Sequence, residues 1–421
     1  MPARREAAST PAAARHALAA APAPATDAPG LYVHVPFCSR ICPYCDFAVL
    51  IGGPERRARF VDTLAREAAS WSGRWRHGGV PFDTVYLGGG TPSALAPEQL
   101  AAVLAALRSA LPIADDAWVS LEANPEDVTP AALAGWRQVG VGTLTLGVQS
   151  FDDAALRFLG RRHDGAGARR AVEAALAAVL PIVGVDLIYG LPDDSTSRWL
   201  GDLAAATALA PQHLSCYQLT IHEGTPFGFR LARGRLAELP DDDQAELFRL
   251  THEELASRGW PGYEVSNFAA APHLRSRHNR KYWRHVPYLG LGPSAHSFDG
   301  GSRWWNERKL GPWTAAVEGG ASPIAGRETI GDAEAALEHV LLGLRSDGVD
   351  LARLRRLGWD LLATAAPAVE RAVAAGLLRH AGERLVPTLA GWTVADGLAA
   401  DLAATAPAAA PLGANAGAAL A

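Results

Sequence analysis

The stretch LYVHVPFCSRICPYCDFAVL, residues 31–50, places three cysteines within eight positions of the chain. Cys38, Cys42 and Cys45 have the spacing Cys-x3-Cys-x2-Cys, and the 421 residues contain only one further cysteine, Cys216. The apolar segment LYVHV (31–35) before the cluster predicts a β-strand. The three thiols are therefore expected on a loop that directly follows a strand.

Three chemistries use clustered thiols, and the spacing alone leaves them open. A disulfide pairs cysteines two by two, so three thiols would leave one unpaired. Structural zinc normally takes four nitrogen or sulfur ligands, so His34 or Asp46 would have to complete the site. An iron–sulfur cluster is held by thiolates, and a cubane held by three of them keeps one iron open to a small molecule. In this last interpretation, having three thiols and not four is what leaves one iron free to bind a small molecule.

The composition is that of a folded globular protein. Hydrophobic residues make up 49% of the chain and charged residues 20%, and 421 residues suffice for two units plus tails. The net charge of −5 argues against a broad basic face, so nucleic acid is not a predicted partner.

Both ends of the chain are rich in Ala and Pro, and residues 1–30 and 401–421 are predicted to be disordered. The most apolar run, AALAAVLPIVGV (174–185), is 12 residues long and contains Pro181, so no transmembrane segment is predicted. The missing signal-peptide pattern and the odd thiol cluster favour a cytoplasmic location. The sequence leaves open whether residues 1–30 target the chain.

Short β-rich segments alternate with helical patterns between residues 31 and 230. Helices such as PEQLAAVLAALRSAL (97–111) carry their large apolar side chains on one stripe. Strands separated by crossover helices pair in parallel, which predicts an α/β fold of about six units, fewer than the eight of a closed barrel. The predicted strands after the first are TVYL (84–87), WVSLEAN (118–124), TLTLGVQS (143–150), PIVGVDLIYGLP (181–192) and HLSCYQLT (213–220).

Polar residues recur toward the downstream ends of these predicted strands. In parallel α/β folds the carboxyl ends of the strands meet at one mouth, where ligands bind. Each residue alone has an ordinary structural explanation, but their common phase predicts a binding site at that mouth. The residues are Gly88–Thr91, Glu122, Gln149, Asp186, Tyr217 and Gln218.

Taken together, these features resemble the radical S-adenosylmethionine (radical SAM) superfamily. The resemblance is carried by the cysteine spacing, by Tyr44 directly before the third cysteine, and by GGGTP (88–92). It implies a partial (β/α)6 barrel with a 4Fe-4S cluster on Cys38, Cys42 and Cys45, and S-adenosylmethionine (SAM) on the open iron. The glycines would let the backbone approach the methionine end of SAM.

Longer segments resemble the family that contains anaerobic coproporphyrinogen III oxidase, a dehydrogenase, and the heme chaperone HemW. They run from about Leu31 to about Thr393 and include LEANPEDVT, LGVQSFDDAALRFLGRRH, YQLTIHEGTPF and GYEVSNFA. The resemblance implies that Glu122 accepts from the SAM amino group, Arg161 pairs with its carboxylate and Asp186 bonds its ribose. The full implied set of SAM contacts is Tyr32, Tyr44, Gly89, Gly90, Thr91, Glu122, Gln149, Arg161 and Asp186.

The branch of the family is indicated by Phe47, HNRKYW (278–283) and RWWN (303–306). The dehydrogenase branch has a fourth cysteine where this chain has Phe47, and a structured N-terminal arm in place of the Ala/Pro extension. The two motifs resemble the heme chaperone branch, which implies heme as cargo and hemoproteins, respiratory enzymes among them, as partners. The alternative function is radical decarboxylation of coproporphyrinogen III. The sequence leaves open whether SAM is cleaved, which hemoprotein receives heme, and whether the chain forms a homodimer.

His278 is the first candidate for a contact with heme iron, since imidazole is a common axial ligand. His285 and His296 are weaker candidates. The alternative is that the HNRKYW segment only locks a loop over the barrel mouth, with His278 bonded to backbone. Cys216, inside an apolar strand, is expected to be a core thiol.

The predicted domain organisation has a partial barrel at 31–230, a family-specific extension over its mouth at 231–310, and a small C-terminal domain at 311–400. Helices followed by a hairpin with Gly382 at its turn make this last domain α+β and winged-helix-like. The chain departs from the family pattern at Thr143, where an arginine is usual, and at GLPDDS (190–195). These departures affect only the loop shape near the ligand.

Overall fold

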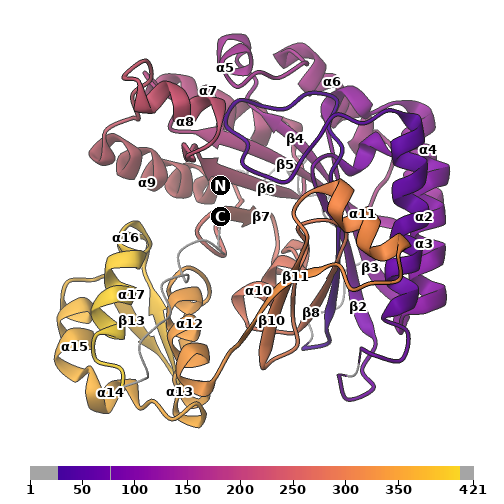
Figure 1. Cartoon of the computed structure of the whole chain (residues 1–421). Coiled ribbons are helices and arrows are strands. Elements are labelled where there is room, and N and C mark those ends of the chain that lie inside the picture. Colours follow the sequence, from indigo (N-terminus) through magenta and orange to yellow (C-terminus); the bar gives the residue numbers. More distant parts are fainter. Residues whose placement is uncertain (1–26, 76, 408–421) are drawn as a thin grey trace, which may run out of the picture.

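The computed structural model describes residues 27–75 and 77–407. The predictions made for residues 1–26 and 408–421 lie outside this part of the chain. The predicted disorder of 1–30 is wrong at its end, because Pro29 and Gly30 are buried and Gly30 begins β1. Six parallel strands follow one another in chain order across the sheet, which confirms the predicted parallel α/β fold (Figure 1). They are β1 (Gly30–Val35), β2 (Phe82–Gly89), β3 (Ile113–Ala123), β4 (Val141–Gln149), β5 (Ile182–Tyr189) and β6 (His213–Gln218).

Helices connect these strands, and several begin at a side-chain cap just after the mouth of the sheet. Thr129, Asp152, Asp164 and Ser195 each accept a hydrogen bond from the backbone N–H three residues on, which satisfies an otherwise unpaired donor of the first turn. The helices are α2 (Pro54–Ser70), α3 (Pro97–Ala110), α4 (Pro130–Gln138), α5 (Asp153–Phe158), α6 (Gly165–Ala177), α7 (Thr196–Leu209), α8 (Pro226–Ala232) and α9 (Asp241–Ser257), with short 3-10 turns η1 (Pro92–Ala94), η2 (Pro125–Asp127) and η3 (Pro272–Leu274).

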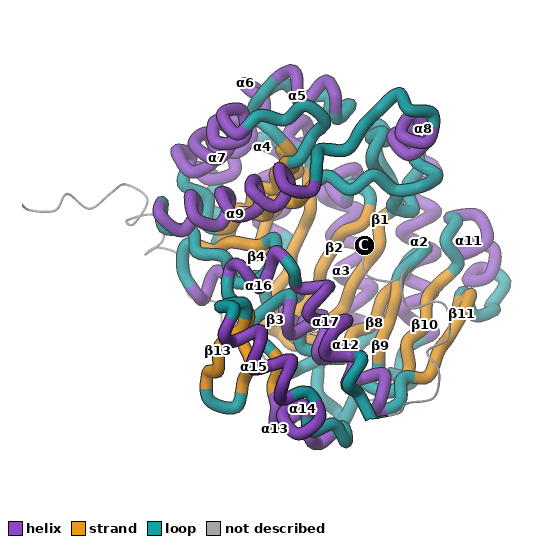
Figure 2. Tube along the Cα trace, turned by 90° about the vertical axis from the view of Figure 1, so that its left-hand side faces the viewer, coloured by secondary structure: helices purple, strands orange, loops and turns teal. Residues whose placement is uncertain are grey.

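The two faces of the sheet differ in burial. Leu31, Val33 and Leu87 are 0% exposed on the face that packs against helices. Alternate positions on the other face, here called the inner face, remain partly accessible, and Tyr217 is 40% exposed. Figures 1 and 2 show α2, α3 and α4 on one side of the sheet and the C-terminal helices on the opposite side. The inner face is therefore the open side of a partial barrel.

Five further strands extend the sheet at both edges, to eleven strands in all among the described residues. Within residues 231–310, predicted as an extension over the mouth, 267–269, 288–291, 296–298 and 302–306 form strands, because the open edges of β1 and β6 offer unpaired backbone groups. These strands are β7 (Asn267–Ala269) beside β6, β8 (Tyr288–Leu291) parallel to β1, and then β9 (His296–Phe298), β10 (Ser302–Asn306) and β11 (Ile324–Thr329). Short α10 (Asn279–Trp283) precedes β8, and α11 (Leu310–Glu318) precedes β11. That the rest of residues 231–310 covers the mouth stays a prediction.

Glu67 joins the β8–β11 extension to the helix layer. Its carboxylate accepts hydrogen bonds from the Gly292 backbone N–H at 2.7 Å, Asn306 Nδ2 at 2.6 Å and Trp313 Nε1 at 3.2 Å. Burial raises the pKa of Glu67 to about 7. Asn306 is the last residue of RWWN, so the asparagine of that motif forms one of the buried hydrogen bonds between the extension and the helix layer.

The C-terminal unit has its own core around Leu344, Trp359 and Leu385 and a three-stranded sheet with the order β12-β14-β13. Helices on a small hairpin sheet match the predicted α+β character, and Gly382 has a φ of 60° at the hairpin turn. The elements are α12 (Asp332–Leu344), β12 (Val349–Asp350), α13 (Leu351–Arg356), α14 (Leu361–Thr364), α15 (Ala366–Ala374), β13 (Leu378–Ala381), β14 (Arg384–Pro387), α16 (Leu389–Thr393) and α17 (Ala395–Ala403).

The predicted boundaries of this unit differ from the packing. Trp313 of α11 lies in the large core, and β11 pairs with β10, so we propose a boundary near residue 332 rather than 311. At the other end α17 continues to Ala403 with Leu402 buried, so the predicted tail does not begin at 401. Glu338 of α12 binds Arg303 of β10 and His285 at 2.6 Å each, which fastens the unit to the large sheet. No described helix is long and apolar enough to span a membrane.

Candidate functional site

The three clustered cysteines lie on a loop between β1 and α2. The loop is closed at its base, where Leu50 N–H donates to Pro36 O at 2.8 Å and Cys38 N–H donates to Leu50 O at 3.0 Å. Cys45 N–H donates to Cys42 O at 3.2 Å, which makes a tight turn between the second and third thiol. All three side chains are partly accessible. The loop therefore presents three thiols at the carboxyl end of β1, as the sequence predicts.

Two donors from other elements reach these sulfur atoms. Thr91 Oγ1 donates to Cys38 Sγ at 3.4 Å, and Arg161 Nη1 donates to Cys42 Sγ at 3.4 Å. Asn124 joins the two donors, since its Nδ2 donates to Thr91 Oγ1 at 3.2 Å and its Oδ1 accepts from Arg161 Nη2 at 2.6 Å. Donors aimed at sulfur favour thiolates, the form that binds metal.

This donor set fits an iron–sulfur cluster better than zinc. Burial raises the pKa of Cys45 to about 11 and also raises that of Cys38, so a metal centre has to drive their deprotonation. Within the described chain no three His, Cys, Asp or Glu side chains converge on one metal ion, whereas a cubane takes each thiolate on a different iron. His34 is no fourth zinc ligand, because its Nδ1 bonds Tyr32 and its Nε2 bonds Ala48 O.

The glycine motif after β2 is required by the packing of β2 against β1. Gly89 has a φ of 104°, and a Cβ atom there would lie 2.5 Å from the ring of His34. At Gly90 a Cβ would lie 2.8 Å from Val35 O, and the Gly90 N–H donates to the same oxygen at 2.8 Å. A side chain at either position would thus collide with the protein itself. The predicted approach of this backbone to SAM stays a prediction.

Two carboxylates from neighbouring parts of the sheet share the inner face. Glu122 of β3 accepts a hydrogen bond from Tyr86 at 2.7 Å. Asp186 of β5 bonds Ser215, its cross-strand neighbour, while its Oδ1 is buried and has no partner among the described residues. Burial raises the pKa of both, that of Asp186 to about 7, and the charge of Glu122 adds to the shift of Asp186. Asp186 therefore has an acceptor atom available to a bound donor group.

The other predicted SAM contacts lie at two depths of the inner face. Tyr44 packs against Phe227 at the mouth, with ring centroids 6.4 Å apart. Gln149, at the end of β4, has a φ of 69°, a strained backbone for a residue with a side chain. Tyr32 lies deeper and stacks on Tyr86 at 6.2 Å. The structure thus brings the predicted residues to the inner face and to the loops at its mouth, and their contacts with SAM stay a prediction.

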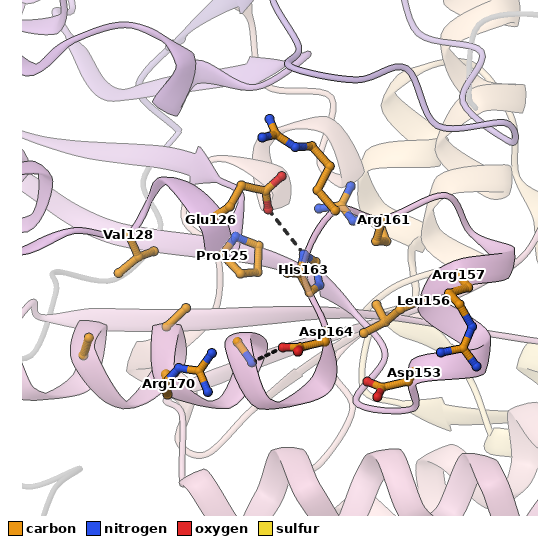
Figure 3. A pocket seen from close by; sticks show the side chains of 14 residues that line it. Pro125, Glu126, Val128, Asp153, Leu156, Arg157, Arg161, His163, Asp164 and Arg170 are labelled. Carbon is orange, nitrogen blue, oxygen red and sulfur yellow. Dashed lines mark hydrogen bonds and ion pairs between the residues drawn. The ribbon is translucent and has the colours of Figure 1, made fainter.

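Arg161 also lines a cavity of about 660 Å³ on the helix side of the site (Figure 3). The cavity lies between η2, α5, the loop after α5, and α6. His163 fixes its wall, because one ring nitrogen bonds Val148 O at 2.9 Å and the other bonds Glu126 at 3.3 Å. The cavity lies behind the loop that places Arg161 next to the cysteines.

The heme prediction for His278 is not supported by the geometry. His278 is 1% exposed, its Nδ1 bonds Thr84 at 2.9 Å and its Nε2 bonds Tyr282 at 2.9 Å. Both ring nitrogens are thus engaged, and Thr84 lies near the amino end of β2, away from the cysteine loop. The alternative interpretation places HNRKYW on a loop over the barrel mouth, with His278 bonded to backbone. The bonds of His278 are to the Thr84 and Tyr282 side chains, and Thr84 lies toward the opposite end of the sheet, so the segment holds the structure together there and not at the mouth.

Sequence reasoning missed Asn124 and Tyr86 as members of the site. Asn124 is the last residue of the predicted strand WVSLEAN, and Tyr86 alternates with the buried Val85 and Leu87 in TVYL. Their positions at a strand end and on the inner face were signals that could have identified both. Cys216 is 2% exposed in β6 and lies in the core, as expected for a structural thiol.

If Asp186 bonds SAM, replacement by Asn should weaken SAM binding about tenfold, since a hydrogen bond to a charged group contributes about 1.5–3 kcal/mol. Because its pKa is raised to about 7, Asp186 loses its charge below that pH. SAM affinity should therefore rise between pH 6 and 8 in the wild type and change less in Asp186→Asn. Calorimetric titration at several pH values measures both effects. Asp116→Asn, at an exposed position near the amino end of β3, is the matched control, and equal affinities in all three proteins would remove Asp186 from the site.

Known proteins show the same architecture and closely related sequences. The radical SAM superfamily model matches residues 32–203, and the HemN C-terminal domain model matches residues 332–394. The heme chaperone HemW of Mycobacterium tuberculosis is 37% identical over 374 residues, which cover 87% of this chain and 93% of the relative. The heme chaperone HemW of Synechocystis is 36% identical over 77% of this chain and 79% of the relative.

A solved structure shows the fold independently. Coproporphyrinogen III oxidase (HemN) from Escherichia coli, described as a radical SAM enzyme, superposes with a TM-score of 0.75 over 90% of this chain and 91% of that chain, at 20% identity. These findings confirm the superfamily and the branch that the motifs predict. The chain therefore belongs to the radical SAM superfamily and, within it, to the heme chaperone HemW family.

Proposed function

We propose that this chain binds heme and delivers it to hemoproteins, on a scaffold that holds a 4Fe-4S cluster and SAM. The observation that carries the proposal is the 37% identity, over 87% of the chain, to a relative named a heme chaperone. The alternative, oxidation of coproporphyrinogen III, is supported by a shared fold alone, because the solved oxidase is 20% identical.

Phe47 supports the same choice. It stands where the dehydrogenase branch has its additional cysteine, and it is 52% exposed on the cysteine loop. A phenyl ring offers no thiolate there. The chain thus keeps the three thiols of the superfamily and lacks the feature that marks the dehydrogenase branch.

Cys38, Cys42 and Cys45 would hold the cluster, which when bound supplies electron transfer to SAM. Thr91 and Arg161 donate hydrogen bonds toward the sulfur atoms and so stabilise their negative charge. We also propose a cytoplasmic location, because such a cluster needs reduced cysteines and all four cysteines of the chain are free thiols. Respiratory enzymes that contain heme are the acceptors we propose to test first.

A transfer assay tests this function. The chain loaded with heme is mixed with an acceptor in its heme-free form, and the absorption spectrum is followed as heme moves. We expect transfer faster than from free heme, and no decarboxylation of coproporphyrinogen III under anaerobic conditions with SAM and a reductant. Turnover of coproporphyrinogen III with SAM cleaved in step would favour the dehydrogenase alternative instead.

A further inference from the structure

The three predicted heme-ligand histidines differ in how their rings are engaged. His278 has both nitrogens bonded, and His285 binds Glu338 through Nε2 at 2.6 Å. His296 of β9 is partly accessible and makes no side-chain hydrogen bond within the described part of the chain. Of the three, His296 alone offers an unbonded imidazole.

His296 lies on the inner face, at the mouth end of the sheet. On β9 it alternates with Ser297, whose cross-strand partner Trp304 packs against Trp71 and Trp75 on the helix side. Because β9 runs antiparallel to β8, and β8 runs parallel to β1, the start of β9 lies at the carboxyl end of β1. The imidazole therefore lies on the inner face, at the end of the sheet from which the cysteine loop also begins.

Trp305 holds the ring of His296 in a defined orientation. The two residues are cross-strand partners, and their rings stack with centroids 5.8 Å apart and an angle of 26°. The next residue in the same row is Gly326 of β11, where a Cβ would lie 2.3 Å from the Trp305 ring. The glycine lets the indole lie flat across the strand. This row gives the imidazole a rigid support on one side.

Positive charge lies next to this row. Arg308 lies two residues after the end of β10, is exposed, and donates through Nη2 to Asp46 O at 2.5 Å. Asp46 is the residue after Cys45, so Arg308 joins the row to the cysteine loop. A guanidinium with remaining free N–H groups suits a carboxylate, and heme carries two propionate carboxylates.

We propose that His296 ligates the iron of bound heme, with Trp305 as the residue that positions the imidazole and Arg308 facing a propionate. The inference rests on the proposed heme-chaperone function and names the site within it. An axial imidazole stands upright on the macrocycle, so an indole stacked on its flat side supports it without occupying the heme plane.

Titration of ferric heme into the full chain with its cluster reconstituted tests the site. The wild type should bind heme saturably with the absorption spectrum of an imidazole-ligated iron. His296→Ala should bind at least about tenfold more weakly, since even removal of a residue that supports a metal ligand costs about 10–100-fold. Added imidazole should restore the spectrum of His296→Ala. Trp305→Leu should keep His296 as the iron ligand but hold its ring less firmly. Heme should therefore bind more weakly, with the same type of absorption spectrum as the wild type.

His380→Ala, an exposed histidine of the C-terminal unit, is the matched control and should behave like the wild type. Iron content and the melting temperature of each variant show whether it is folded. If the wild type binds heme and His296→Ala binds it equally with the same spectrum, the assignment of His296 is wrong while the proposed function stands. If the wild type itself binds no heme, the proposed function fails first.

Discussion

Replacement of Cys42 by serine is expected to remove essentially all iron and sulfide from the chain after anaerobic reconstitution. A serine hydroxyl does not supply a thiolate, and a cubane held by the remaining two cysteines has lost one of its three protein anchors. The substitution also deprives Arg161 of its sulfur acceptor at 3.4 Å. Chemical assay of iron and sulfide, with the visible absorption spectrum, measures the loss.

Cys216→Ser is the matched control for this result. Cys216 is a core residue of β6, 2% exposed, and is not on the cysteine loop. Its replacement should leave iron and sulfide at the wild-type level, with some loss of stability from a buried hydroxyl. Full iron content in Cys42→Ser, or equal loss in Cys216→Ser, would contradict the assignment of the cluster to the loop.

The second large effect is expected at Lys281, one of only two lysines in the chain. Its side chain is 1% exposed, and its Nζ lies 2.6 Å from Asp83 Oδ1 and donates to Ala28 O at 2.6 Å. Removal of one partner of a buried ion pair costs about 3–5 kcal/mol because the other charge stays buried. Lys281→Met should therefore lower the free energy of unfolding by about 3 kcal/mol, since Arg277 remains 3.3 Å from Asp83.

A double-mutant cycle with Asp83→Asn separates the free energy of the Lys281–Asp83 ion pair from the free energy lost through poorer packing. Asp83→Asn together with Lys281→Met should be less destabilised than the sum of the two single variants, because the double variant leaves neither the Lys281 ammonium nor the Asp83 carboxylate buried without the other, and only Arg277 loses its partner. Denaturant unfolding of the four proteins gives the coupling free energy. Strict additivity would show that the HNRKYW segment does not act through this ion pair.

The sequence predicts the central sheet well because its signals are local. Each β-rich run is followed by a helix pattern, and the polar residues toward the strand ends meet at one mouth of the sheet because the strands are parallel. The extent of the sheet was less predictable. β7 has three residues and β9 has three, too short to show periodicity, and their pairing depends on the open edges of strands far away in the chain.

The site was predictable where chemistry fixes spacing, and unpredictable where contacts are long-range. The three cysteines lie on one loop, so their spacing carries the site. Asn124 joins Thr91 to Arg161 across three separate segments, which no local pattern reveals. His278 was a reasonable ligand candidate by residue type, but its bonds to Thr84 and Tyr282 depend on packing that the sequence does not show.

Electron paramagnetic resonance of the reduced chain, recorded with and without SAM, tests the central claim most directly. With a cubane on Cys38, Cys42 and Cys45 and one iron open to SAM, we predict a 4Fe-4S signal whose shape changes when SAM is added. A chain without an iron–sulfur signal, or a signal that saturating SAM leaves unchanged, would contradict the account.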